Sequence, residues 1–298
     1  MEKIKLFEAW LAEKATSEDI KKLKDIMTLP YEKFVEVLKD NAKDPKVQAI
    51  LNMGKEDGLA MDEKVKVNDT AAFACKDLIP TQSQIGLADS LSWLGQKKPE
   101  AAGDFIKGNT HMFDNNRILT ANGKYILDGH HRWSQVCLFN PDAKIPAVDL
   151  SIPGLDEKDL LRVVQVAIAA TYKDVFMKPA NSETDIFDES KMSDEKMRAK
   201  LPELLGEKMT EIAKKAYGFS TDEEVYEKIV ENAQVIKEKK PKDAPARDFM
   251  PQPGDTAKQA GRTDSETKDF KGIPGEFIDK LKSGNLNFKS PLKKGEKK

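Results

Sequence analysis

The sequence predicts a mixed α/β (α+β) protein in which a small sheet lies between two helical regions of the chain. Between residues 64 and 152, strand patterns alternate with turns and helical spacing, which is typical of a mixed sheet core. Residues 1–60 and 153–238 show helical spacing instead. From 239 to 298, proline, glycine and charged residues dominate, so we expect a linker and a basic tail that are largely disordered.

The overall charge is close to balanced. The 298 residues include 49 Lys and Arg against 51 Asp and Glu, a formal net charge of −2, which argues against general electrostatic capture of nucleic acid.

The sequence has no run of about 18 apolar residues, as a membrane span would need. Acidic residues interrupt the apolar positions at its start, unlike a secretory signal. Cys75 and Cys137 lie in apolar stretches, so we expect buried thiols in a reducing, cytoplasmic compartment.

The first 60 residues predict a helical arm. Leu29-Pro30 separates the second and third of three apolar groups with helical spacing. The three groups are Leu6, Phe7, Trp10 and Leu11; then Ile20, Leu23, Ile26 and Met27; then Tyr31, Phe34, Val35 and Leu38. Two uses of the arm stay open. It packs as a small helical subdomain, or it docks onto a protein partner through Phe7 and Trp10.

The central region predicts the sheet. Val65 and Val67 alternate with polar residues, and the apolar run 71–75 follows, so we expect strands here. A turn over 78–82 leads into helical spacing from Ile85, and 95–108 is expected to be loop-rich. Asn122-Gly123 between two apolar runs is a strong hairpin signal. A helix over 131–139 and a strand over 145–150 complete the unit.

The C-terminal half predicts further helices. Residues 156–177 are apolar nearly all round, which indicates a buried helix. A second helical stretch over 193–237 is expected to be interrupted near Pro202 and Gly218. Within the tail, the apolar island 273–278 is a candidate for docking, with its partner left open, and lysines dominate the last ten residues.

The most informative string is Tyr125-Ile126-Leu127-Asp128-Gly129-His130-His131-Arg132-Trp133, which contains two of the three histidines. A strand delivers Asp128 to its end, Gly129 permits a tight turn, and the following helix start favours an anion. His131 and Arg132 add donors suited to phosphate. Asp128 suits a magnesium ion, a sugar hydroxyl or a proton. The alternative is a structural helix start capped by Asp128. A zinc site is not expected, because adjacent helical histidines diverge and no cysteine pair has ligand spacing.

This motif resembles the phosphate-binding signature of the ParB/sulfiredoxin superfamily, and the Leu78-Ile79-Pro80-Thr81-Gln82 turn is similar to that family's first box. The resemblance covers about residues 64–150. DGHHRW is most similar to the box of ParB-like free-serine kinases, which use ADP or ATP; ParB partition proteins use CTP. The resemblance implies that Gly129, His130, His131 and Arg132 cradle nucleotide phosphates, with Asp128 beside the transferred group or its magnesium.

Two departures from the family pattern change the expected chemistry. His130 stands where sulfiredoxins carry their cysteine, so sulfinic acid reduction is not expected. Gln82 stands where the serine kinases carry a catalytic glutamate, and an amide cannot accept the serine proton. Gln82 can still orient a water or substrate, Asp128 can supply the base, and Thr81 with Gln82 can contact a base or ribose.

The sequence leaves three functional classes. The first is a nucleotide-binding protein that hydrolyses or transfers phosphate from ATP, ADP or CTP with magnesium, using Asp128, Gln82 and His131 as catalytic candidates. The second is a phage virion or interaction protein, because Lys5–Leu11 is similar to the starts of tailed-phage proteins; such a protein would lie in the host cytoplasm or the virion, and the basic tail would contact a partner. The third is a ParB-like DNA-binding protein or nuclease, although 156–237 contains no clear basic recognition helix.

Overall fold

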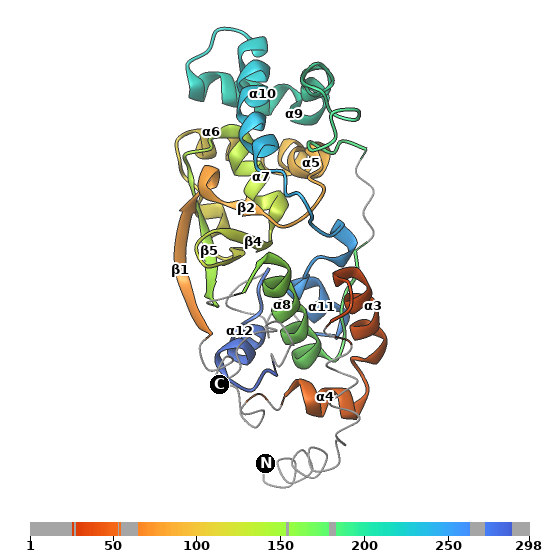
Figure 1. The fold of residues 1–298 in the computed structure, drawn as a ribbon. Helices are drawn as coiled ribbons and strands as arrows, with labels where there is room; N and C mark the ends of the chain where they lie inside the picture. Colours follow the sequence, from red (N-terminus) through yellow and green to blue (C-terminus); the bar gives the residue numbers. More distant parts are fainter. Residues whose placement is uncertain are drawn as a thin grey trace. The chain divides into compact units, whose positions relative to one another are not determined.

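The computed structural model describes residues 26, 28–52, 54, 65–152, 155–178, 183–262 and 272–287 (Figure 1). The fold divides into two compact units, each built from segments that are distant in sequence. Unit 1 consists of Met1–Asn68, Leu150–Met177 and Phe249–Lys298, and unit 2 consists of Asp69–Asp149 and Lys178–Asp248. Most of the expected α/β region (64–152) and most of the expected helical region (153–238) therefore belong to one unit, unit 2. The expected helices before residue 26, with Phe7 and Trp10, and the terminal lysines lie outside the described residues.

The structure confirms a mixed α/β fold around a five-stranded sheet with strand order β1-β5-β3-β4-β2. The strands are β1 (Lys66–Ala74), β2 (Ile79–Pro80), β3 (Ile118–Ala121), β4 (Tyr125–Asp128) and β5 (Lys144–Ser151). β4 pairs with β3 antiparallel and with β2 parallel. The predicted hairpin is confirmed between β3 and β4. Asn122 and Gly123 both have positive φ, 54° and 65°, as a mirror-image turn requires.

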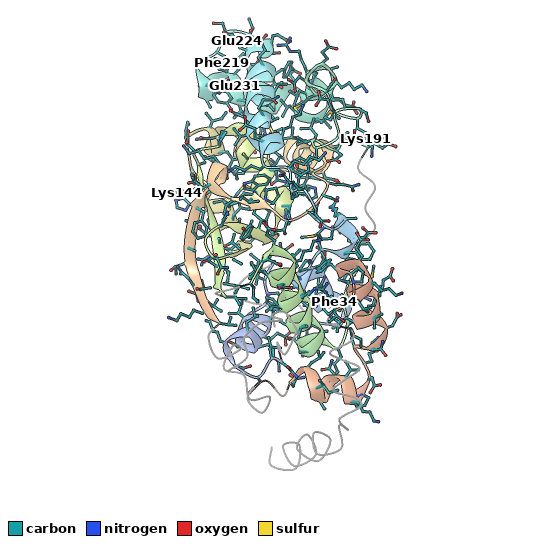
Figure 2. The ribbon with its side chains drawn as sticks, viewed as in Figure 1. Phe34, Lys144, Lys191, Phe219, Glu224 and Glu231 are labelled. Carbon is teal, nitrogen blue, oxygen red and sulfur yellow. The ribbon has the colours of Figure 1, made fainter. Side chains whose placement is uncertain are left out.

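In unit 2, helices cover the sheet in two layers. α5 (Leu87–Lys97), α6 (Glu100–Ile106) and α7 (His130–Phe139) lie next to the strands, and α9 (Asp194–Tyr217) and α10 (Asp222–Glu238) pack on these helices from the other side (Figure 1). Glu224, labelled in Figure 2, reaches back to Thr221 and closes a capping box at the start of α10. The short 3-10 turn Cys75–Asp77 links β1 to β2, and the 3-10 turn His111–Phe113 lies between α6 and β3.

Two local predictions in unit 2 are wrong. The segment 95–108, expected to be loop-rich, contains the end of α5 and all of α6, whose Ala101, Ala102 and Phe105 are buried. The expected break near Pro202 lies instead at Gly206, where φ is 67° and ψ is 165°, while α9 runs through Pro202. Glycine adopts this positive φ without steric cost, so the kink forms where the backbone is most permissive.

In unit 1, α8 (Glu157–Tyr172) is the central helix. It is buried nearly all round, as predicted, and α3 (Tyr31–Asn41), α4 (Pro45–Leu51), α11 (Pro253–Gln259) and α12 (Gly275–Lys282) pack against it. α3 buries the four apolar residues that the spacing predicts. One of them, Phe34, is labelled in Figure 2, and the guanidinium carbon of Arg162 on α8 lies 4.9 Å from its ring centroid.

The expectation that 239–298 is largely disordered is wrong for the part that the structure describes. α11 begins at Pro253, a residue that favours the first turn of a helix. α12 buries Phe277, Ile278 and Leu281, and it contacts α8, so the apolar island packs within unit 1. Across the described ranges, the structure has no helix that is long and apolar enough to cross a membrane.

Candidate anion-binding site

Both cysteines are core residues of unit 2. Cys75 and Cys137 are free and buried. Burial raises the pKa of Cys137 to about 12 and holds that of Cys75 well above its usual value. Neither thiol has the thiolate character that nucleophilic chemistry needs, so neither cysteine is a candidate nucleophile.

The end of β4 fixes the start of α7. Gly129 follows Asp128 and has φ 93° and ψ 25°, in the left-handed region. A Cβ added to Gly129 would lie 2.6 Å from Cγ2 of Ile118 and 2.8 Å from Nη2 of Arg132. Because both the backbone angle and the space exclude a side chain, glycine is required where the strand turns into the helix.

The first turn of α7 presents main-chain N–H groups at this turn. The backbone N–H of Trp133 donates to Gly129 O, which closes the first helical hydrogen bond. The three preceding N–H groups, of His130, His131 and Arg132, have no acceptor within the helix because of helical geometry. The N-cap, Gly129, has no side chain to satisfy them. The start of α7 therefore has the donors and the dipole that favour an anion.

Arg132 is oriented beside this turn by two hydrogen bonds. Its Nη2 donates to Oδ2 of Asp128 at 3.0 Å, and its Nη1 donates to Oδ1 of Asn116 at 3.0 Å. The side chains of Arg132 and Asp128 are mostly buried, at 19% and 14% exposure. Nε of Arg132 is buried without a hydrogen-bond partner. The guanidinium is thus held in place, and its buried Nε–H is left without an acceptor.

His130 has a structural role through its side chain. The ring is buried, and its Nε2 accepts a hydrogen bond from the backbone N–H of Thr81 at 3.1 Å. Burial, with the positive charges of Arg132 and Arg247, lowers the pKa of His130 to about 3. The imidazole is therefore neutral and ties the turn after β2 to the start of α7. Of this residue, the backbone N–H rather than Nε2 is suited to a phosphate.

His131 lies next to a second carboxylate, Asp89 on α5. Its Nε2 is 3.8 Å from Oδ2 of Asp89, and the same oxygen accepts a hydrogen bond from Nη1 of Arg247 at 2.8 Å. Burial first, and then Arg247, holds the pKa of His131 well below its usual value, so the 3.8 Å contact is not an ion pair at neutral pH. Nε2 of His131 is buried and has no hydrogen-bond partner. A buried polar atom in this state is uncommon and indicates a place for a ligand group.

Thr81 and Gln82 lie in the turn after β2, and their side chains are largely occupied within the fold. Oγ1 of Thr81 donates to Ile126 O at 2.5 Å, and Nε2 of Gln82 donates to Gln84 O. Each residue is only 3% exposed. The hydrogen bond between Thr81 and His130 thus joins the turn after β2 to the start of α7. The Gln82 amide group, in contrast, donates within its own turn, to Gln84 O.

Arg247, Lys178 and Asp89 are site residues that the sequence did not predict. Arg247 lies in the stretch that was expected to be a linker, and this stretch is anchored to the turn after β2 because the N–H of Ser83 donates to Pro245 O. Both Arg247 and Lys178 are close enough to lower the pKa of His131. No local signal marks them, because their place depends on contacts over long sequence separations.

The described residues include no group of three or more His, Cys, Asp and Glu side chains that could hold a metal ion. His111, the third histidine, is exposed, and its Nδ1 lies 3.0 Å from Oδ2 of Asp114. A magnesium ion commonly binds through one or two carboxylates together with phosphate oxygens and water. Asp128 fits that limited role, as a single carboxylate beside the anion-binding turn.

The chain was compared with protein-family models, curated proteins and solved structures, and none of them matches it. The resemblance to the ParB/sulfiredoxin superfamily therefore stays a prediction from the motif residues alone.

Proposed function

We propose that this protein binds the phosphate groups of a nucleotide at the start of α7, as a ParB-like nucleotide-binding protein. The observation that carries the proposal is the pair of buried atoms without hydrogen-bond partners, Nε2 of His131 and Nε of Arg132, on adjacent residues of the first turn. Together with the free N–H groups of that turn, Nε of Arg132 would donate to phosphate oxygens, and His131 would add a donor in its Nε2–H tautomer.

The charged groups around the turn favour an anionic ligand with several acceptor oxygens. Arg132, Arg247 and Lys178 are cationic, and Asp128 and Asp89 each hold one of the arginines. Because both histidines are neutral at pH 7, the arginines and the lysine supply the positive charge. A diphosphate or triphosphate bridges such separated cations better than a single phosphate does.

We propose phosphoryl transfer or hydrolysis at the same turn. Such chemistry needs positioning and charge neutralisation more than covalent help from the protein. Magnesium would supply further charge neutralisation, and Asp128 is the residue placed to hold it or to accept a proton. Gln82 cannot act as the base that a serine kinase needs. We therefore propose hydrolysis of ATP, ADP or CTP, or phosphoryl transfer to another acceptor, in preference to serine phosphorylation.

A thermal-shift panel with ATP, ADP, CTP and GTP in magnesium tests the proposal, because a ligand that binds the native state raises the melting temperature. Arg132→Ala is expected to abolish the shift. Arg198→Ala is the matched control, since Arg198 pairs with Glu223 and Glu227 among the outer helices and is far more exposed. Hydrolysis should exceed that of an Asp128→Ala variant. The proposal is wrong if no nucleotide shifts the wild type, or if Arg132→Ala responds like Arg198→Ala.

A further inference from the structure

We infer that Trp93 on α5 stacks against the base of the nucleotide whose phosphates lie at the start of α7; this inference rests on the proposed function. Trp93 is 49% exposed, and among the described residues Met112 is the only other large apolar side chain that is exposed. Trp133, by contrast, is fully buried, and its Nε1 donates to Cys75 O. An exposed tryptophan has a wide apolar face and a single donor, which suits a flat ligand ring.

The position of Trp93 places it beside the anion-binding turn. Asp89 and Trp93 are four residues apart on α5, so they lie on the same face, one turn from each other. Helical side chains tilt toward the N-terminus of their helix, which directs the indole back over the turn that carries Asp89. Asp89 in turn contacts Arg247 and lies 3.8 Å from Nε2 of His131.

The combination of a cationic group and a neighbouring aromatic face selects one class of ligand. Inorganic phosphate or polyphosphate would use the donors of α7, Arg132 and Arg247 but would leave the indole in water. A nucleotide carries its phosphates and its flat base at opposite ends, so it can use both features. Base stacking on an aromatic side chain tolerates any base, and it therefore predicts affinity for the nucleoside part without fixing which base is preferred.

Calorimetry with two kinds of probe separates the base from the phosphates. Magnesium complexes of ATP, ADP, CTP and GTP are compared with magnesium tripolyphosphate, for the wild type, Trp93→Ala, Trp93→Phe and Gln96→Ala. Gln96 is exposed on the next turn of the same helix and serves as the control. Trp93→Ala should weaken nucleotide binding about 5- to 150-fold, the range that base–aromatic stacking gives, and should leave tripolyphosphate binding within about 2-fold.

Trp93→Phe should retain most of the nucleotide affinity, because a phenyl ring still stacks, and Gln96→Ala should bind like the wild type. In the wild type the nucleotide should also quench tryptophan fluorescence, and this quenching should disappear in Trp93→Phe although the nucleotide still binds. The inference is overturned if Trp93→Ala binds nucleotides as the wild type does, or if it weakens nucleotide and tripolyphosphate equally. If the wild type binds neither probe, the proposed function itself is wrong.

Discussion

The neutral state of His130 makes the stability of unit 2 depend on pH. The pKa of this histidine is about 3 in the folded protein, compared with 6.5 for an ordinary histidine, because the ring is buried. Below pH 6.5 the unfolded chain therefore binds a proton that the folded protein does not. The free energy of unfolding must fall as the pH falls from about 6.5 toward 3.

The size of this effect follows from the two pKa values. At about pH 4.5 the unfolded histidine is protonated and the folded one is still neutral. Each pH unit below 6.5 costs about 1.4 kcal/mol, so the loss at that pH is about 2.7 kcal/mol from His130 alone. Other groups that titrate add their own contributions.

A matched variant isolates the contribution of His130. In His130→Gln, the side-chain oxygen can still accept the Thr81 N–H, but no proton is bound. Urea unfolding at about pH 7 and about pH 4.5 is followed by tryptophan fluorescence, to which Trp133 in the core of unit 2 contributes. Between the two pH values, the wild type should lose about 2–3 kcal/mol more than His130→Gln. Equal losses in the two proteins would refute the buried, neutral histidine.

Three further predictions follow from single contacts. Gly129→Ala should destabilise the protein by about 2 kcal/mol or more in urea unfolding, because alanine at φ 93° is strained and its Cβ would meet Ile118; an unchanged midpoint would contradict the turn geometry. Cys75 and Cys137 should resist a thiol reagent at about pH 8 until the chain unfolds, since burial raises both thiol pKa values; rapid reaction of either thiol in the native protein would contradict this. Thr221→Ala removes half of the capping box of α10 and should cost about 1 kcal/mol, whereas an exposed mid-helix substitution such as Glu227→Ala should change stability much less.

Local signals predicted much of the fold. The Asn122-Gly123 turn, the helix that starts after Gly129 and the buried face of α3 each depend on residues close in sequence, and the structure confirms all three. α6 was missed because its short run of small residues between Pro99 and Gly108 resembles a loop. α11 was missed because its proline and glycine, typical of linkers, occupy the first turn of a helix.

Contacts between distant segments could not be predicted in the same way. The start of α5 is capped by residues about a hundred positions later. Oγ1 of Thr184 accepts from the N–H of Ala88, and Oδ1 of Asp185 accepts from the N–H of Ile85. Arg247 reaches Asp89 over an even longer separation of 158 positions. The motif thus predicted the centre of the candidate site, whereas its second arginine and its neighbouring carboxylate depend on the tertiary fold.

The central claim is that the start of α7 binds nucleotide phosphates, and calorimetry of the full-length chain tests it most directly. Titration with the magnesium complexes of ATP, ADP, CTP and GTP should show binding of at least one nucleotide to the wild type and to Arg198→Ala. Arg132→Ala should lose about 10-fold or more in affinity, because hydrogen bonds to charged groups contribute about 1.5–3 kcal/mol. Absence of binding to the wild type, or equal affinity in Arg132→Ala and Arg198→Ala, would contradict the account.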